Sequence, residues 1–505
     1  MNLDAVFRAA AASSKQSPAI LNQDGSCRLS YEDLDRAIES SCKALRAAGL
    51  KPGSCIGVHY PSGADYIVLT YAVWRAGACV VPVPVDAAIA EKLRIFSEIG
   101  IDGIISEPGA ARDLGLPIVG AVHLVEACHE FSVLRPARAH PPGFCDINPA
   151  FLRFSSGTTG TAKGVVLSHE TILARVAAAN MMLMIGPGDR IVWLLSMAYH
   201  FAVTIVAYLS YGAAIVICRD QQGVTIVEAA RRSQASVIYG ALLHFEWMLQ
   251  DCPEQIPLTS VRLAIATTAA MRPALSMRFR QRFGIPVNRA LGIIEVGLPC
   301  VDIEPDALEE GSVGRVLTAY ALELRPITPG SEHREILLKG PGLFDAYYQP
   351  FARREELMPD GWFPTGDLGE LDANGRLYVL GRIKEVINIG GMKVFPARIE
   401  SVLNAHPQVV ESCAYSHPHP VRGEVPHASV VLAPSAAAAD VTALALKQHC
   451  MRLLPAYAIP SRFNFVACLP RTPSGKLIRR EIAHLPQLPA TGRPHAEPSR
   501  DQETV

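Results

Sequence analysis

The chain has 505 residues, roughly three times the size of an average domain, so we expect two or three domains. Its 47 Lys and Arg residues against 48 Asp and Glu residues give a net charge of −1, which removes the general electrostatic case for nucleic-acid binding. A hydrophobic content of 49% with 19% charged residues excludes a mostly disordered chain and can supply a large core.

Apolar, β-branched runs alternate with helical patterns over the first 320 residues. Helices are predicted over Tyr31–Ala48 and Arg272–Phe283. Between such helices the pattern predicts buried strands at Cys55–His59, Cys79–Val83, Gly103–Ser106, Val237–Gly240 and Val261–Ala266. This alternation indicates an α/β fold with mixed sheets and helices packed over them.

A 28-residue segment between Arg190 and Arg219 contains no charged residue and is long enough to cross a bilayer. It also contains His200 and divides into two strand-like runs, Ile191–Leu195 and Ala214–Cys218, with a short apolar helix between them. We therefore expect buried core here and no membrane span.

The pattern changes twice towards the C-terminus. From about residue 321, short strands and turns around Asn374-Gly375 indicate a small barrel-like part or an antiparallel extension. After residue 381 the pattern becomes a compact α+β arrangement, and from residue 486 it becomes rich in Pro, Ala and Arg. The prediction is a large N-terminal domain (1–381), a small C-terminal domain (382–485) and a disordered tail (486–505).

Twelve cysteines are spread along the chain, and the closest pair, Cys42 and Cys55, is 13 residues apart. Because cysteine-based zinc sites use short-range pairs, we expect no metal site of that kind. The N-terminal residues include Asp4 and lack the long apolar run of a signal peptide. Buried thiols in the cytoplasm are the simplest expectation.

The strongest local signal is the run Phe154-Ser-Ser-Gly-Thr-Thr-Gly-Thr-Ala-Lys-Gly164, which lies between two predicted strands. Glycines let the backbone approach a ligand closely, hydroxyls can donate hydrogen bonds, and Lys163 adds a positive charge. The run lacks the G-K-[ST] of a Walker A loop. A polyphosphate-binding loop is therefore predicted, with a flexible Ser/Gly/Thr linker as the alternative.

This loop and five further motifs resemble those of the AMP-forming adenylating enzymes, which include acyl-CoA synthetases, peptide-synthetase adenylation domains and firefly luciferase. The resemblance runs from about residue 29 to residue 482. The other motifs are Leu29-Ser-Tyr-Glu-Asp-Leu34, Trp74-Arg-Ala-Gly-Ala-Cys-Val-Val-Pro-Val83, Gly361-Trp-Phe-Pro-Thr-Gly-Asp367, Gly381-Arg-Ile-Lys-Glu385 and Arg471-Thr-Pro-Ser-Gly-Lys476.

The resemblance implies roles for individual residues. Glu295 would be associated with magnesium, Asp367 and Arg382 would bind the ribose or phosphate, and Lys476 would bridge carboxylate and α-phosphate. Lys384 would be the hinge about which a mobile small domain rotates between two half-reactions. His200 would take part in substrate binding and gating, and the remaining nucleotide contacts would be Ser155, Ser156, Gly157, Thr158, Thr159, Gly160, Lys163, Thr268 and Gly292.

The sequence departs from the family pattern at several of these places. Leu291 and Ile294 stand where the family usually has an aromatic residue and a threonine, so adenine stacking and a hydroxyl for the α-phosphate are missing. Thr267 and Thr268 replace a Gly-Gly and add bulk beside the expected acyl pocket, which favours a short, slim or flat substrate. Tyr199 occupies the usual histidine position, and His200 follows one residue later.

The resemblance implies ATP-dependent activation of a fatty or aryl carboxylic acid to acyl-AMP with release of pyrophosphate, followed by transfer to the thiol of coenzyme A. ATP, Mg²⁺ and coenzyme A would then be the cofactors. One alternative acceptor is the phosphopantetheine of an acyl carrier protein. Another alternative is a degenerate nucleotide- or acyl-binding protein, motivated by Leu291 and Ile294.

Overall fold

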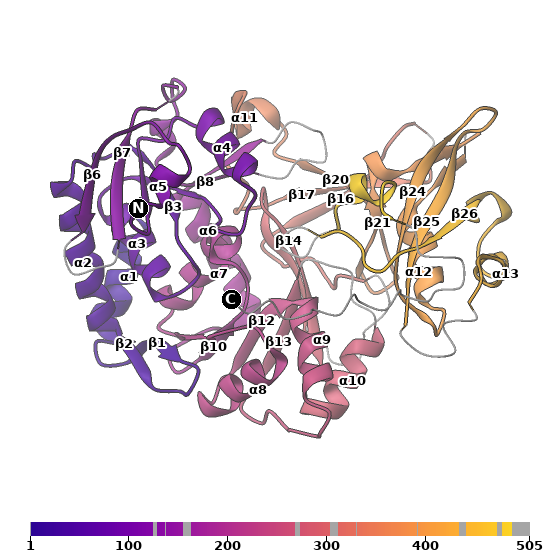
Figure 1. The fold of residues 1–505 in the computed structure, drawn as a ribbon, viewed down its shortest axis with the longest axis horizontal. Coiled ribbons are helices and arrows are strands. Elements are labelled where there is room, and N and C mark those ends of the chain that lie inside the picture. The colour runs from indigo at the N-terminus through magenta and orange to yellow at the C-terminus, as the bar shows by residue number, and fades with distance from the viewer. Residues whose placement is uncertain are drawn as a thin grey trace, which may run out of the picture. The chain divides into compact units, whose positions relative to one another are not determined.

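The computed structural model describes residues 2–124, 129–136, 138–154, 163–267, 273–303, 312–329, 331–390, 392–433, 441–471 and 477–486. Two compact units divide the chain (Figure 1). The large unit comprises Met1–Glu323, Leu337–Thr365 and Leu371–Tyr378, and the small unit comprises Leu324–Ile336, Gly366–Glu370 and Val379–Val505.

In the described part of the large unit, one sheet has nine strands in the order β19-β18-β9-β8-β4-β3-β5-β7-β6. The predicted strands Cys55–His59 and Gly103–Ser106 are confirmed as β3 and β5, and β4 ends one residue before the predicted Val83. The bounds are β19 Phe351–Arg353, β18 Ala346–Tyr348, β9 Gly164–Ser168, β8 Pro149–Phe154, β4 Cys79–Pro82, β3 Cys55–His59, β5 Gly103–Ser106, β7 His129–Leu134 and β6 Ile118–Leu124.

A second sheet of this unit has eight strands among the described residues, in the order β15-β14-β13-β12-β10-β11-β1-β2. Helices α8 (Gly223–Arg232), α9 (Leu242–Asp251) and α10 (Pro273–Phe283) pack on one face of it, and their apolar side chains join the strands in one core cluster (Figure 1). The bounds are β15 Gly297–Asp302, β14 Val287–Ile293, β13 Leu263–Thr267, β12 Val237–Ala241, β10 Arg190–Trp193, β11 Ala214–Ile217, β1 Pro18–Asn22 and β2 Cys27–Ser30.

The uncharged segment forms β10, helix α7 (Met197–Ser210) and β11, as the sequence predicted. Helix α7 has 14 residues, and none of the described helices is long and apolar enough to span a bilayer.

Sequence signals account for the remaining helices of the large unit. Helix α2 (Tyr31–Ala47) begins at Ser30, whose side chain and that of Asp33 form a capping box, and its buried residues recur at helical spacing. The others are α1 Leu3–Ser13, α3 Ala64–Arg75, α4 Ile89–Glu98, α5 Ala110–Asp113, α6 His169–Leu183 and α11 Arg354–Leu357.

The predicted barrel-like part is an open sheet. Its four strands are β16 (Ala321–Pro326), β17 (Arg334–Lys339), β20 (Phe363–Leu371) and β21 (Leu377–Arg382), in the order β16-β17-β20-β21. A barrel requires the first and last strands to pair, and within the described residues β16 and β21 remain edges. Of the two expectations, the described strands therefore form an open extension of short strands and no closed barrel.

The small unit has the predicted α+β character. Strand β25 lies between β24 and β22 and also pairs with β26, and α12 packs with α13 around one apolar cluster. The bounds are β22 Ile387–Ile389, β23 Met392–Val394, β24 Val409–His419, β25 Gly423–Leu432, β26 Arg462–Phe465, α12 Pro396–Asn404, α13 Ala443–Met451 and α14 Arg479–Ile482. The predicted tail, residue 486 apart, lies outside the described residues, and the boundary at residue 382 stays a prediction.

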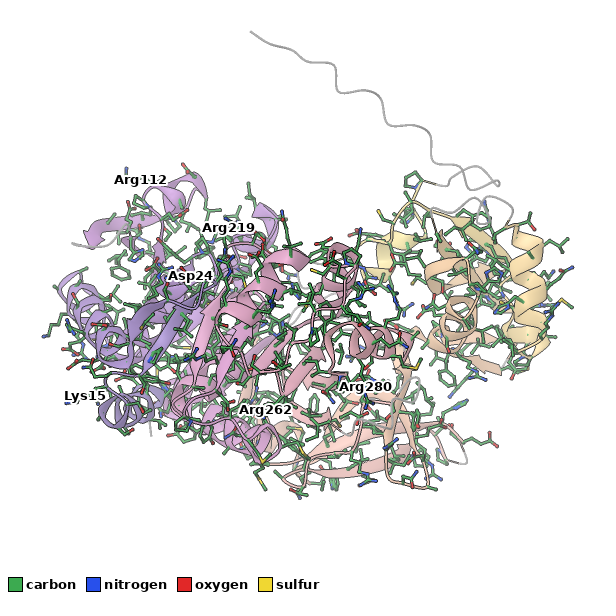
Figure 2. All side chains as sticks on the ribbon, turned by 90° about the horizontal axis from the view of Figure 1, so that it is seen from below. Lys15, Asp24, Arg112, Arg219, Arg262 and Arg280 are labelled. Atoms are coloured by element: carbon green, nitrogen blue, oxygen red, sulfur yellow. The ribbon has the colours of Figure 1, made fainter. Side chains whose placement is uncertain are left out.

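Charged side chains mostly lie at the surface of the large unit, as Lys15, Arg112 and Arg280 do (Figure 2). Arg175 is an exception, with an exposed fraction of only 1%. Arg153 is another, since its Nε atom is buried. Burying an arginine is costly unless hydrogen bonds or opposite charges compensate it.

Candidate active site

The predicted phosphate loop connects two antiparallel strands, as the sequence indicated. Strand β8 ends at Phe154 and β9 begins at Gly164, and these two residues are the last pair before the loop. Residues Ser155, Ser156, Gly157, Thr158, Thr159 and Gly160 lie outside the described residues. The hairpin nevertheless fixes both ends of the loop, so whatever the loop binds lies near the ends of β8 and β9.

Lys163 and Glu295 both contact one tyrosine, Tyr347. The Lys163 Nζ atom lies 4.4 Å from the centre of the Tyr347 ring, and the Tyr347 hydroxyl donates a hydrogen bond to Glu295 Oε1 at 3.4 Å. Burial and the negative charge of Glu295 raise the pKa of the Tyr347 phenol, so it remains a donor. Tyr347 therefore contacts a cation through its ring and a carboxylate through its hydroxyl, an arrangement suited to a phosphate with a bound cation.

The backbone around Glu295 is held by Arg175 of helix α6. Arg175 donates from one guanidinium nitrogen to Ile294 O at 3.1 Å and from the other to Gly342 O at 2.5 Å. The Glu295 carbonyl also accepts a hydrogen bond from Phe344 N at 2.7 Å. These contacts fix the turn that follows β14 and with it the direction of the Glu295 side chain.

Sequence reasoning missed Arg175, although a signal was present. Arg175 lies on the same helical stripe as the buried residues Ile172 and Val176, where a charged residue is unexpected. Burial lowers its pKa to about 10, and the charges of Asp345 and Glu295 act in the opposite direction. It therefore remains a cation at neutral pH.

Arg153 lies on the same side of the nine-stranded sheet as Tyr347. Arg153 is opposite Val165 in the β8–β9 pair, and Val165 is opposite Tyr347 in the β9–β18 pair. Residues directly opposite one another in antiparallel strands point to the same face, so the side chains of Arg153 and Tyr347 share a face. Glu295 accordingly contributes to the electrostatic field at Arg153.

The guanidinium of Arg153 is anchored at the beginning of helix α7. It donates to the carbonyl oxygen of Tyr199 and lies 5.0 Å from the centre of the Tyr199 ring. Burial lowers the pKa of Arg153 to about 10, and burial together with Asp86 and Glu91 raises the pKa of Tyr199 to about 12. At neutral pH this is a cation stacked on a neutral phenol.

His200, one residue further along α7, packs edge-on against Trp193, with ring centres 6.5 Å apart. Strand β13 ends at Thr267, and Gly292 is the residue before the last one of β14. A Cβ on Gly292 would lie 3.7 Å from Thr267 Oγ1. Thr268 lies outside the described residues. Thr267 and Gly292 lie near the carboxyl ends of the parallel strands β13 and β14, and open α/β sheets bind their ligands at such ends.

In the small unit the structure brings together two further predicted residues. Arg382 Nε lies 2.7 Å from Asp367 Oδ1, and the Asp367 side chain is only 9% exposed whereas that of Arg382 is 43% exposed. Gly366 precedes Asp367 with a φ of 72°, a conformation that glycine adopts without strain. Lys384 is exposed in the 3-10 turn Ile383–Glu385, and Lys476 lies outside the described residues.

Comparison with known proteins places this geometry in a family. Residues 7–348 match the model of the AMP-binding enzymes, and residues 398–476 match that of the AMP-binding enzyme C-terminal domain. The chain belongs to the AMP-binding enzyme family. The resemblance drawn from the sequence motifs is thereby confirmed.

Among its relatives is a sulfoacetate–CoA ligase of Cupriavidus necator, 30% identical over 95% of this chain and 97% of that protein. A 2-succinylbenzoate–CoA ligase of Bacillus velezensis is 31% identical over 66% of this chain and 69% of its own. A long-chain-fatty-acid–CoA ligase of Mycobacterium tuberculosis is 27% identical over 95% and 97%. All three are named as CoA ligases.

Solved structures confirm the fold of this AMP-binding enzyme. ATP-bound MatB from Rhodopseudomonas palustris superimposes with a TM-score of 0.81 at 22% identity, over 95% of this chain and 98% of that one. The o-succinylbenzoate CoA synthetase of Bacillus subtilis, in complex with its acyl-adenylate intermediate, gives 0.79 at 22% identity over the same shares. The predicted α/β fold with a large and a small part is the fold of these enzymes.

Proposed function

We propose that this AMP-binding enzyme is an ATP-dependent acid–thiol ligase of the acyl-CoA synthetase type. It would join a carboxylic acid to the α-phosphate of ATP, giving acyl-AMP and pyrophosphate, and would then transfer the acyl group to the thiol of coenzyme A. Full-length similarity to a sulfoacetate–CoA ligase supports this assignment. The other named CoA ligases among its relatives support the same acceptor.

The observation that carries the proposal is the arrangement of Lys163, Tyr347 and Glu295 beside the loop of β8 and β9. Adenylation moves negative charge onto the leaving pyrophosphate, so positive charge must lie along the triphosphate. Lys163 supplies one such charge, and the predicted loop contacts would supply backbone and hydroxyl donors. Arg175 holds the backbone next to Glu295, and the Tyr347 hydroxyl donates to the Glu295 carboxylate.

The described residues fit a magnesium ion that is held mainly by the nucleotide. No group of three His, Cys, Asp or Glu side chains suited to a metal occurs among the residues that the structure describes. Mg²⁺ usually binds one or two protein carboxylates together with substrate phosphates and water, so the single Glu295 is sufficient. When bound, the ion would neutralise phosphate charge. Glu295 would hold it, and Tyr347 would orient Glu295.

Residues of the small unit have proposed roles of their own. Asp367 would accept hydrogen bonds from the ribose hydroxyls, and its ion pair with Arg382 keeps the carboxylate in place for that contact. Lys384 would be the hinge, and Lys476 would bridge the carboxylate and the α-phosphate during adenylation. His200 would line the acyl pocket or the path of the thiol, together with Tyr199.

The acid is proposed to be short, slim or flat, because buried Thr267 adds bulk beside Gly292. The cytoplasm is the proposed location, since coenzyme A ligation takes place where ATP and the cofactor are available. The free thiols of buried cysteines such as Cys55, Cys79 and Cys300 agree with a reducing compartment.

The proposal is tested by acid-dependent ATP–pyrophosphate exchange with Mg²⁺ and no thiol, followed by thioester formation with coenzyme A. The acid panel should include sulfoacetate, 2-succinylbenzoate, fatty acids and 4-coumarate. Exchange with at least one acid and a coenzyme A thioester as the product would support the ligase. If exchange occurs but the acyl group is transferred only to a purified acyl carrier protein, that carrier and not coenzyme A is the acceptor. Nucleotide binding without exchange for any acid would instead favour a degenerate binding protein.

A further inference from the structure

Arg153 is a cation that the proposed handling of the triphosphate leaves unused. Among the residues that the structure describes, no carboxylate oxygen forms an ion pair with it, and its buried Nε atom has no hydrogen-bond partner. Its described contacts are the carbonyl and the ring of Tyr199. Among the described residues, the field of Glu295 and the contacts with Tyr199 compensate this charge only in part, so the guanidinium retains donors that an anion can bind.

Arg153 lies on the face of the nine-stranded sheet that also carries Tyr347, the partner of Glu295. Both residues are paired with Val165 of β9, and the Tyr347 hydroxyl donates to Glu295. Lys163, at the other end of the loop, lies over Tyr347. Arg153 instead reaches α7, the element that carries Tyr199 and His200 and follows the carboxyl end of β10. The two cations at the ends of the phosphate loop therefore have different surroundings.

The contacts of Arg153 favour the acid over the nucleotide as its ligand. Its guanidinium is bound to the backbone of α7, beside the residues proposed for the acyl pocket. The planar fork of a guanidinium matches a carboxylate or sulfonate, and stacking on a tyrosine ring orients that fork without consuming its donors. An uncharged acyl chain would leave the Arg153 guanidinium without an anionic partner. Acids with such a chain would therefore bind less well.

We propose that Arg153 binds a second anionic group of the acid substrate, and that the preferred substrate is therefore a short acid with two anionic groups. This inference rests on the proposed ligase function and names its substrate class. One carboxylate is activated, and the other anionic group binds Arg153 through charge-assisted hydrogen bonds. Arg153 acts here as a specificity-determining residue for a doubly charged acid.

The test compares acids that differ in one charge. ATP–pyrophosphate exchange is measured for the wild-type chain with malonate, succinate and glutarate, and with propionate, butyrate and valerate as their singly charged partners. We expect kcat/KM for the best diacid to exceed that of its partner by at least about tenfold, as charged hydrogen bonds of this kind require. A wild-type preference for the singly charged acids would overturn the inference while leaving the ligase function intact.

Arg153→Gln is the informative variant, since glutamine can still donate to the Tyr199 carbonyl but has no charge. We expect its kcat/KM for the diacid to fall about 100-fold, mainly through KM for the acid, and that for the matched monoacid to change less than about threefold. Arg153→Lys should retain part of the preference. Arg190→Gln is the matched control, because Arg190 is also a half-buried strand arginine that donates to one carbonyl, Ser233 O at 2.7 Å.

Other outcomes have distinct meanings. An equal loss for diacids and monoacids in Arg153→Gln, or an increase in KM for ATP, would assign Arg153 to the nucleotide or to folding and would overturn the inference. Melting temperature and nucleotide binding of each variant separate those two cases. Absence of exchange with every acid in the wild-type chain would overturn the ligase function itself, and the inference with it.

Discussion

Arg479 donates from Nε to the carboxylate of Glu385 at 3.0 Å, and this contact joins two segments of the small unit that carry proposed functional lysines. Glu385 follows Lys384, and Arg479 lies three residues after Lys476. Arg479 also binds Glu400 at 2.5 Å and the carbonyl of Ala414 at 2.9 Å. Burial raises the pKa of Glu385, and Arg479 opposes that shift. The proposed hinge and the segment after the proposed catalytic lysine thus share one ion-pair network.

Arg479→Lys should weaken this network, because lysine cannot bind both carboxylates with a planar fork. We expect the free energy of unfolding of the small unit to fall by about 2 kcal/mol and the adenylation rate to fall with it. Urea denaturation and single-turnover acyl-AMP formation measure the two effects. Arg471→Lys is the matched control, since its pair with Glu411 is more exposed and such pairs contribute about 0–1 kcal/mol. Equal destabilisation by both variants would contradict a special role for Arg479.

Tyr347→Phe should separate the two contacts of this residue. The ring beneath Lys163 remains, whereas the hydroxyl that donates to Glu295 is lost. The Mg²⁺ concentration that gives half-maximal exchange should therefore rise by about five- to tenfold. A Mg²⁺ titration of pyrophosphate exchange measures this shift. Tyr348→Phe is the neighbouring control, because the Tyr348 hydroxyl binds Gly100 N and His140. If both variants shifted the Mg²⁺ dependence alike, the effect would belong to the strand as a whole.

Ile294→Thr restores the hydroxyl that the family usually has before its glutamate. Arg175 already holds the Ile294 carbonyl, so the substitution changes the side chain within a fixed backbone. We expect KM for ATP to fall by about two- to tenfold if the hydroxyl reaches the α-phosphate, as one added hydrogen bond would do. Initial rates of exchange over a range of ATP concentrations give this value. An unchanged or higher KM would mean that the site is adapted to isoleucine.

Lys476→Ala should slow adenylation by about 100-fold or more while transfer from supplied acyl-AMP to coenzyme A stays close to wild type. The proposed role requires this difference, because only the first half-reaction forms and breaks bonds at the α-phosphorus. Separate assays of the two half-reactions test it. An equal loss in both would argue against a small domain that changes position between them.

His140 should make the stability of the large unit depend on alkaline pH. Hydrogen bonds to Asp102 and to the Cys55 thiol raise its pKa to about 10 from the ordinary 6.5, against the effect of burial. Because the pKa of His140 is raised on folding, its contribution to the free energy of unfolding is fully present below about pH 6.5. This contribution is lost as the pH rises through about 10. The difference in unfolding free energy between wild type and His140→Gln should therefore shrink between pH 7 and pH 10. A constant difference over this range would contradict a charged His140.

The sequence by itself determined the order of elements, the family and the position of the phosphate loop. Strands such as Cys55–His59 are short apolar runs, and such a run by itself predicts a strand that is buried on both faces. The motif around Lys163 is continuous in the chain, so it can be recognised without the fold. The sequence left open whether the four-stranded sheet closes into a barrel, because local patterning does not say whether β16 pairs with β21.

Only the tertiary structure decided which residues act together. Arg175 meets Ile294 and Gly342, 119 and 167 residues away, and Arg153 meets Tyr199 across 46 residues. No spacing rule relates such positions, because their side chains converge through the pairing of β8, β9 and β18 and the packing of α6 and α7. The physical reason is that charge on a buried guanidinium depends on the groups that surround it in space, and the sequence specifies those groups only through the folded chain.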